Sequence, residues 1–348
     1  MGMTLYEKSP IYRATVDRVD SIFQQYTGYS LLAKIKSMPL DSQEIFIQTM
    51  AQPSLLMFQI GIIELYRYYG IEPSVVVGVS FGEIAAAYVA RSITQEEAVR
   101  IIYYRSNFSH RTMGLGKTII IRSNLEDMLN RFRESKISTL LSERMEEVSR
   151  VSRSSSILCG KEDDIILLKS LLEDQGISSY ILPLPGTFHC SAQDSIRSEV
   201  LSTFSDIQGQ APCSESIKWY STVTGQLKSD GINSSYIYEN IREPVNFVGA
   251  IDSIVRDIKD SGESIDNYIF IEISPSAILY DMIKDTLPNT TVVSPVFKRK
   301  DEYLYFLSSL AQLYCLGFQM NFNLQFSKDE INVYNNNNQL KVINQLFE

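Results

Sequence analysis

A short apolar strand that runs almost directly into an alanine-rich helix is the feature that most constrains how this chain can fold. Val75–Gly78 is a continuously apolar run, Ile84–Ala90 has helical character, and only Val79 to Glu83 separate them. Continuous apolar runs of this length are typical of strands buried in a parallel sheet. The pattern therefore predicts an α/β fold with a tight strand-to-helix turn at Ser80.

This turn, Gly78-Val79-Ser80-Phe81-Gly82, has the G-x-S-x-G form of a nucleophile elbow, in which a strained turn exposes a serine hydroxyl. The motif alone also fits an ordinary glycine-bearing turn with a buried serine. The preceding strand and the following helix are the context that the elbow requires, and the helix N-terminus would direct N–H groups toward charge developing beside the serine. We therefore predict that Ser80 is a nucleophile.

A serine nucleophile requires a base, and the chain has only two histidines. His110 lies in the polar segment NFSHRT, which is typical of a solvated helix face. His189 lies in LPLPGTFHCSAQ, directly after a predicted strand. A lone histidine can equally be a structural residue, but His189 is the better placed of the two. We predict it as the base, and no acidic partner is indicated by spacing.

Composition excludes several classes of function. The 348 residues include 32 Lys and Arg against 41 Asp and Glu, a formal charge of −9, which argues against nucleic acid or an anionic membrane as the main partner. No run reaches the roughly 18 apolar residues of a membrane span, and the N-terminus lacks the apolar core of a secretory signal. Four scattered cysteines and two histidines predict no metal site and a reduced, cytoplasmic location.

The order of predicted elements indicates two units. Residues 117–186 give the strand–helix–strand–strand–helix–strand pattern of a ferredoxin-like α+β insert. Residues 1–116 and 187–320 give an α/β-hydrolase-like core with a parallel sheet, and 321–348 form a C-terminal linker or tail. Within the core we expect helices over 10–35 and 41–69, the second broken or kinked at Gln52 by Pro53.

Beyond these local patterns, residues 1 to about 320 resemble the acyltransferase domain of a type I polyketide or fatty-acid synthase, in the family of malonyl-CoA:acyl-carrier-protein transacylases. Several segments carry the resemblance in the family's order. They are the opening MGMTLYEKSPIYRATVDRVD, the nucleophile region AQPSLLMFQIGIIELYRYYGIEPSVVVGVSFGEIAAAYVA, and the later RSNF, TFHCSAQ, WYSTVTG, NIREPVNF and FIEISP.

The resemblance implies transfer of an acyl group, typically malonyl, from coenzyme A to Ser80 and then to the phosphopantetheine thiol of an acyl carrier protein, with His189 as base. It implies no bound cofactor. Arg105 matches the arginine that holds the malonyl carboxylate, although it also fits an ordinary helix C-terminal arginine. Gln52 matches a polar pocket residue, and Phe188 matches the wall of malonyl-type pockets.

The chain also departs from the family pattern. The family begins with a strand and a Gly-Gln-Gly-x-Gln loop upstream of Met1, so we expect the chain to lack a central strand and one oxyanion donor, leaving the Phe81 N–H. Losing one such donor costs roughly 10²- to 10³-fold in rate. Val79 replaces the family's histidine, Val151–Ser155 replaces an Asn-Ser-Pro segment, and Ser274-Pro275-Ser276 replaces Gly-Pro-His.

Four hypotheses follow from the sequence. The first is an N-terminally truncated acyltransferase fragment of a polyketide synthase that is crippled or inactive. The second is an active acyltransferase that loads a carrier protein in trans. The third is a non-catalytic remnant that only binds a carrier protein or a synthase partner. A generic esterase is the most distant, since Arg105 would have no role in it.

Overall fold

The apolar strand before Ser80 lies in a small mixed sheet. In a computed structural model that describes residues 1–348 except 40–41, 184–185, 213–216, 296–300 and 322–348, β1 (Val75–Val77) pairs in parallel with β6 (Lys218–Ser221). β7 (Gln226–Leu227) then pairs with β6 in the antiparallel direction. The strand predicted before the turn is confirmed, with Ser80 beyond its C-terminal end.

A second parallel pair lies in the same layer. β8 (Ile269–Ile271) pairs with β9 (Thr291–Val293), and within the described residues β1 and β8 are each paired along one edge only. Side chains of both strands contact the same two hydrophobic clusters, one on each face, so the two pairs are covered by the same helices. The parallel sheet expected for the core is therefore present as two separate pieces.

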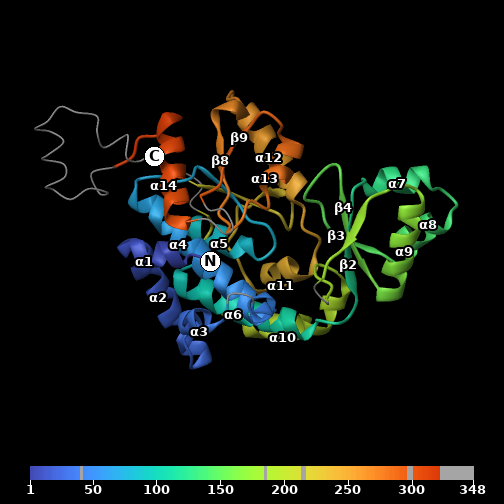
Figure 1. Cartoon of the computed structure of the whole chain (residues 1–348), viewed down its shortest axis with the longest axis horizontal. Coiled ribbons are helices and arrows are strands. Elements are labelled where there is room, and N and C mark those ends of the chain that lie inside the picture. The colour runs from blue at the N-terminus through green and yellow to red at the C-terminus, as the bar shows by residue number, and fades with distance from the viewer. Residues whose placement is uncertain (40–41, 184–185, 213–216, 296–300, 322–348) are drawn as a thin grey trace, which may run out of the picture.

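Helices cover both faces of these strands (Figure 1). The largest hydrophobic cluster includes side chains of α2, α4, α5 and α6, and a second cluster is built largely on α12. The helices outside the insert are α1 (Met3–Lys8), α2 (Pro10–Thr27), α3 (Leu31–Ser37), α4 (Gln48–Tyr68), α5 (Gly82–Val89), α6 (Gln95–Arg111), α10 (Arg197–Thr203), α11 (Ser234–Arg242), α12 (Phe247–Asp260), α13 (Tyr280–Thr286) and α14 (Glu302–Cys315), with short 3-10 turns η1 (Gln43–Phe46), η2 (Ser191–Ile196) and η3 (Ile265–Asn267).

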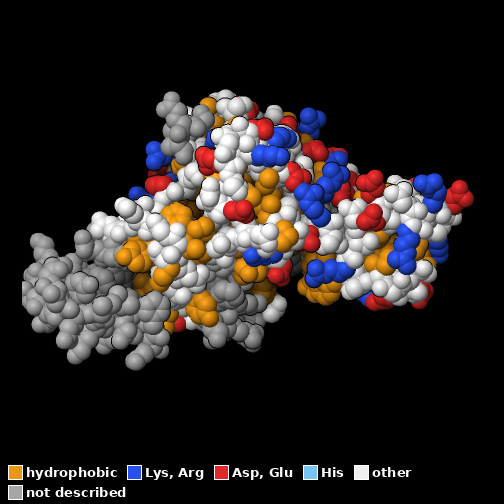
Figure 2. All heavy atoms as spheres, turned by 90° about the horizontal axis from the view of Figure 1, so that it is seen from above, with side chains coloured by type: hydrophobic (Ala, Val, Ile, Leu, Met, Phe, Trp, Pro, Cys, Tyr) orange, Lys and Arg blue, Asp and Glu red, His pale blue; other side chains and the backbone are white. Residues whose placement is uncertain are grey.

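The middle of the chain forms a separate four-stranded antiparallel sheet, at the right of Figure 1. Its elements are β2 (Lys117–Ile121), α7 (Leu125–Arg131), α8 (Lys136–Glu143), β3 (Glu146–Ser149), β4 (Ser156–Gly160), α9 (Glu162–Asp174) and β5 (Ser179–Ile181). The strand order β3-β4-β2-β5 is that of the ferredoxin-like pattern predicted for this segment. On this part of the surface, at the right of Figure 2, basic and acidic side chains are interspersed.

Two helix predictions are wrong in detail. The single helix expected over 10–35 is divided into α2 and α3, because Gly28 takes a left-handed φ of 72° and caps α2 through its N–H to the Gln24 carbonyl. The helix expected over 41–69 begins only at Gln48, after η1, and it is not broken at Gln52, since α4 continues through Pro53. Pro53 lies in the second turn of α4, where its missing N–H removes only the hydrogen bond to the Thr49 carbonyl.

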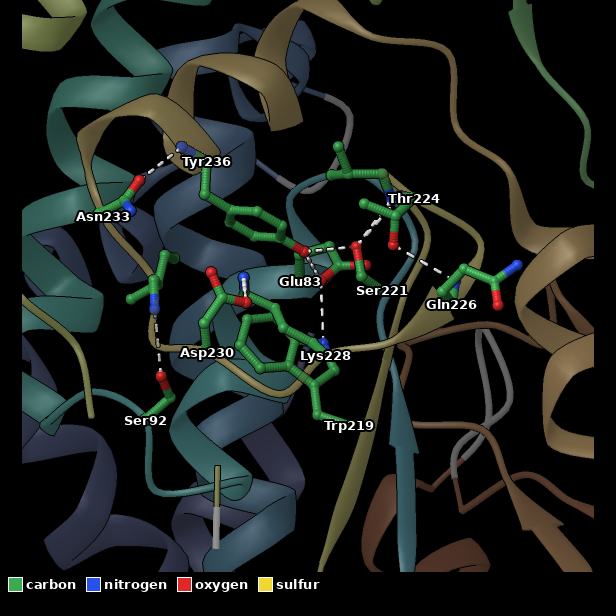
Figure 3. A network of polar contacts seen from close by, with 12 residues as sticks. Glu83, Ser92, Trp219, Ser221, Thr224, Gln226, Lys228, Asp230, Asn233 and Tyr236 are labelled. Atoms are coloured by element: carbon green, nitrogen blue, oxygen red, sulfur yellow. Dashed lines mark hydrogen bonds and ion pairs between the residues drawn. The ribbon is translucent and has the colours of Figure 1, made fainter. Parts of the chain in front are cut away.

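A buried carboxylate holds the strand-to-helix turn against the neighbouring strand (Figure 3). The fully buried Glu83, at the start of α5, accepts hydrogen bonds from Trp219 Nε1 at 3.0 Å and Tyr236 Oη at 2.8 Å. It also accepts from Thr222, through the backbone N–H at 2.5 Å and Oγ1 at 2.8 Å. Burial raises the pKa of Glu83 to about 7, although these four donors act in the opposite direction. Hydrogen bonds from β6, from the residue after it and from α11 thereby hold Glu83, and with it the start of α5, in place.

The two glycines of the turn are predicted to differ in their tolerance of alanine. A Cβ atom on Gly78 would overlap the backbone of Gly82 and Glu83, whereas one on Gly82 would meet no atom within 4 Å. We expect Gly78→Ala to lower the free energy of unfolding by about 1–3 kcal/mol. Gly82→Ala, the matched control, should change it by less than about 1 kcal/mol. Urea denaturation checks both, and equal losses would contradict the steric argument.

Candidate active site

Ser80 and His189 are in contact although 109 residues separate them in the sequence. Ser80 Oγ lies 2.8 Å from His189 Nε2, a hydrogen-bond distance. Both residues have a φ of 56°, in the left-handed region that residues other than glycine rarely occupy. Two strained positions in direct contact are typical of a functional site. The structure thus brings together the two residues that the sequence predicts as nucleophile and base.

The other nitrogen of His189 fixes the direction of the hydrogen bond to Ser80. His189 Nδ1 lies 3.1 Å from the backbone carbonyl oxygen of Glu243, which can only accept, so Nδ1 carries the proton. Nε2 is then free to accept from the Ser80 hydroxyl. Burial, followed by the positive charge of Arg105, lowers the pKa of His189 to about 3. The imidazole is therefore neutral at physiological pH, the state that a base requires.

Arg105 places a buried positive charge beside this pair. Its side chain, 3% exposed, donates from Nη1 to Gln52 Oε1 at 2.7 Å and from Nε to Asn240 Oδ1 at 3.0 Å. Arg105 Nη2 lies 3.4 Å from Ser80 Oγ. No carboxylate among the described residues pairs with it, and burial lowers its pKa to about 9. The partners are neutral amides, so the charge is held in place but not balanced.

Two further amides complete this network and are not indicated by the sequence. Asn240 accepts from Arg105 and donates from Nδ2 to the Ser80 carbonyl at 2.9 Å, so it links the arginine to the backbone of the strained serine. Gln48 accepts a hydrogen bond of 2.8 Å from Gln52 Nε2 and orients the amide that faces Arg105. The only available signal was that Asn240 lies in the segment NIREPVNF, which also supplies the Glu243 carbonyl.

The fully buried Gln193 supports the segment that carries His189. Its Nε2 donates to the Thr187 carbonyl at 2.8 Å, and its Oε1 accepts from Thr112 Oγ1 at 3.1 Å. These bonds fix the backbone two residues before His189 to the end of α6, the helix that also bears Arg105. His189 and Arg105 are therefore both positioned by α6, Arg105 directly and His189 through Gln193.

Two further predicted site residues, Phe81 and Phe188, lie outside the hydrogen bonds that join Ser80, His189 and Arg105. Within the described part of the chain, the Phe81 N–H has no hydrogen-bond acceptor and is free to donate beside Ser80. The half-buried Phe188 has its ring near Gly186, and the hydrogen bonds that join Ser80, His189 and Arg105 do not involve it. Its role as a pocket wall stays a prediction.

The described residues contain no group of three or more His, Cys, Asp or Glu side chains arranged to hold a metal ion. Over the same residues, no helix has both the length and the apolar character needed to cross a membrane.

An α/β fold in which a serine at a strained strand-to-helix turn contacts a neutral histidine is the arrangement typical of a nucleophile elbow. The family model of the acyl transferase domain matches residues 1–317, and this chain belongs to that family. The resemblance drawn from the sequence motifs is confirmed.

Curated relatives and solved structures agree with this assignment. Probable polyketide synthase 22 of Dictyostelium discoideum is 36% identical over 344 residues, which cover 94% of this chain and 13% of that protein. Probable polyketide synthase 17 of the same organism is 35% identical, over 92% of this chain and 12% of its own length. The chain thus spans about one eighth of these relatives.

Among solved structures, the acyltransferase domain from the second module of the salinomycin polyketide synthase superposes with a TM-score of 0.80 at 23% identity, covering 95% of this chain and 73% of that one. A loading acyltransferase of the avermectin polyketide synthase gives 0.77 at 24% identity, covering 90% and 95%. The predicted α/β fold class is confirmed by these neighbours.

The low pKa of His189 predicts a specific loss of stability in acid. Because its pKa of about 3 in the folded chain lies below its ordinary value of 6.5, protons bind more tightly to the unfolded chain. The contribution of neutral His189 to the free energy of unfolding is complete above pH 6.5 and declines as the pH falls from 6.5 toward 3. We expect His189→Gln to lose less stability than the wild type between pH 7 and pH 5, measured by urea denaturation.

His110 is the matched control for this measurement, since it is the second histidine and is exposed. His110→Gln should follow the wild-type pH dependence. A His189→Gln variant with the same pH dependence as the wild type would show that His189 is not buried in its neutral form.

Proposed function

We propose that this chain transfers a malonyl group from coenzyme A, through an ester on Ser80, to the phosphopantetheine thiol of an acyl carrier protein. The observation that carries the proposal is Arg105, a buried guanidinium without a carboxylate partner among the described residues, 3.4 Å from the Ser80 hydroxyl. A planar guanidinium binds a carboxylate through two parallel hydrogen bonds. An acyl group with a free carboxylate would complete this site.

The first half of the reaction forms the acyl-serine. Ser80 Oγ attacks the thioester carbonyl carbon while His189 Nε2 takes its proton, as the 2.8 Å contact and the Nδ1–H bond to Glu243 allow. The free N–H of Phe81 would donate to the developing oxyanion. The carbon–sulfur bond then breaks, and His189 returns the proton to the leaving coenzyme A sulfur.

The second half reverses these roles with a different thiol. His189 takes the proton of the phosphopantetheine thiol, whose sulfur attacks the Ser80 ester, and Ser80 leaves with that proton. A carrier protein or carrier domain as the acceptor is supported by the family and by the polyketide synthase relatives. No other cofactor takes part in these steps.

Impaired activity stays a prediction that depends on the number of oxyanion donors. Phe81 supplies one free donor, and a site with a single oxyanion donor would react roughly 10²- to 10³-fold more slowly than one with two. The Ser80–His189 contact supports catalysis over the alternative of a remnant that only binds a carrier protein or synthase partner.

The proposal predicts which acyl groups load Ser80 and how Arg105 selects them. Intact mass spectrometry after mixing with malonyl-CoA should give a malonyl adduct that Ser80→Ala abolishes. Arg105→Gln should lower the rate of malonyl loading by about 10²-fold, because a charged partner of the carboxylate is lost. Acetyl loading should change much less.

Arg111→Gln is the matched control, since it removes a positive charge from the same helix at an exposed position paired with Glu199. It should leave both rates unchanged. Carrier binding without any adduct on folded protein would support the binding-only alternative, and equal losses of malonyl and acetyl loading in Arg105→Gln would contradict carboxylate recognition.

A further inference from the structure

Two cysteines outside the proposed chemistry lie together beside the base. Cys159, in β4 of the ferredoxin-like sheet, and Cys190, directly after His189, are 3% and 2% exposed. Their side chains pack in one small cluster with Val148, and both residues are free cysteines. The pair therefore joins two parts of the fold at a position one residue from His189.

Glu146 fixes this arrangement independently of the sulfur atoms. It is the register partner of Cys159 across the β3–β4 pair. Its carboxylate accepts hydrogen bonds from Ser191, the residue after Cys190, through the backbone N–H at 2.9 Å and through Oγ. Neighbours of the two cysteines are thus bonded to each other, which holds β4 against the segment that bears His189.

The two thiols have different chemical characters. Interaction with Cys159, together with the Thr187 side chain and the Ala192 N–H, lowers the pKa of Cys190 against the effect of burial. Interaction with Cys190, and then burial, raises the pKa of Cys159. A thiolate is the reactive form of cysteine, so this asymmetry fits an attacking Cys190 and a resolving Cys159. Glu146 and Ser191 are exposed, so the pair lies just beneath the surface.

We propose that Cys159 and Cys190 form a peroxide-sensitive dithiol whose oxidation to a disulfide displaces His189 and slows acylation of Ser80. The Cys190 thiolate attacks hydrogen peroxide, the oxygen–oxygen bond breaks, and a sulfenic acid and hydroxide form. The Cys159 sulfur then attacks the Cys190 sulfur, expelling hydroxide. The two thiols lose two electrons and two protons, and one peroxide becomes two waters.

The disulfide acts on catalysis through the backbone. A sulfur–sulfur bond of about 2.0 Å requires both side chains to move toward each other. Cys190 follows His189 directly, and His189 has the strained φ of 56° and a single orienting bond to the Glu243 carbonyl. A shift of about 1 Å in a catalytic group costs on the order of 10²-fold in rate. This consequence rests on the proposed function, whereas formation of the disulfide does not.

The test uses the full chain with Cys213→Ser and Cys315→Ser, which leaves only Cys159 and Cys190. After treatment with hydrogen peroxide and unfolding in N-ethylmaleimide, mass spectrometry should find neither cysteine labelled. Dithiothreitol should restore labelling of both. In parallel, malonyl loading of Ser80 should fall by about 10²-fold after peroxide and recover after dithiothreitol.

Cys159→Ser in the same background is the control, because serine keeps the shape of the cysteine side chain but cannot form the bond. Because no disulfide can form, its Ser80 loading should fall much less after peroxide than that of the chain with both cysteines. Labelling of both cysteines after peroxide, or irreversible oxidation of Cys190 alone, overturns the dithiol. A disulfide that leaves Ser80 loading unchanged overturns its effect on His189. If the reduced chain does not load Ser80, the proposed function fails while the labelling result still decides whether the dithiol exists.

Discussion

The buried carboxylate of Glu83 is the interaction on which the geometry of the site depends. Glu83 lies three residues after Ser80 and accepts hydrogen bonds from Trp219 in β6, from Thr222 directly after β6, and from Tyr236 in α11. Thr222 Oγ1 lies 2.7 Å from the Gly78 carbonyl oxygen as well, and it shares its one proton between that carbonyl and Glu83, so one residue contacts both ends of the turn. Desolvating a carboxylate is costly, and four donors offset that cost only while all of them stay in place. Ser80 is therefore held by a network that tolerates little movement.

Hydrogen bonds to Ser80, to His189 and to the backbone near His189 offset the backbone strain at these two residues. Left-handed φ values at residues other than glycine cost of the order of 1–3 kcal/mol each. The Ser80 carbonyl is held by Asn240, the His189 ring by the Glu243 carbonyl, and the Thr187 carbonyl by Gln193. Asn240 and Glu243 lie in and directly after α11, so one short segment supports both strained residues. The same segment supplies Tyr236 to Glu83, which connects the rigid core to the reactive centre.

Features set by local sequence patterns could be predicted from the sequence, whereas contacts between residues far apart in the chain mostly could not. The strand before Ser80, the elbow and the ferredoxin-like strand order depend on local apolar patterns and could be predicted. His189 could be found because the chain has a single alternative, and Arg105 only through the family resemblance. Asn240 and Gln193 could not, because amide side chains occur throughout the chain and their partners lie 135 and 81 residues away. The break expected at Gln52 does not occur, because the one backbone hydrogen bond lost at Pro53 is outweighed by the burial of the α4 side chains around it.

The unbalanced charge of Arg105 connects recognition to reactivity. A buried cation without a carboxylate partner destabilises the free protein, and its field is one of the causes of the low pKa of His189. In the proposed reaction a malonyl carboxylate would neutralise that field when it binds, so the pKa of His189 would rise and its capacity to take the Ser80 proton would increase. An acetyl group would leave the field unchanged. Selection of the acyl group would thus depend on two effects of the same charge, namely binding of the carboxylate and activation of the base.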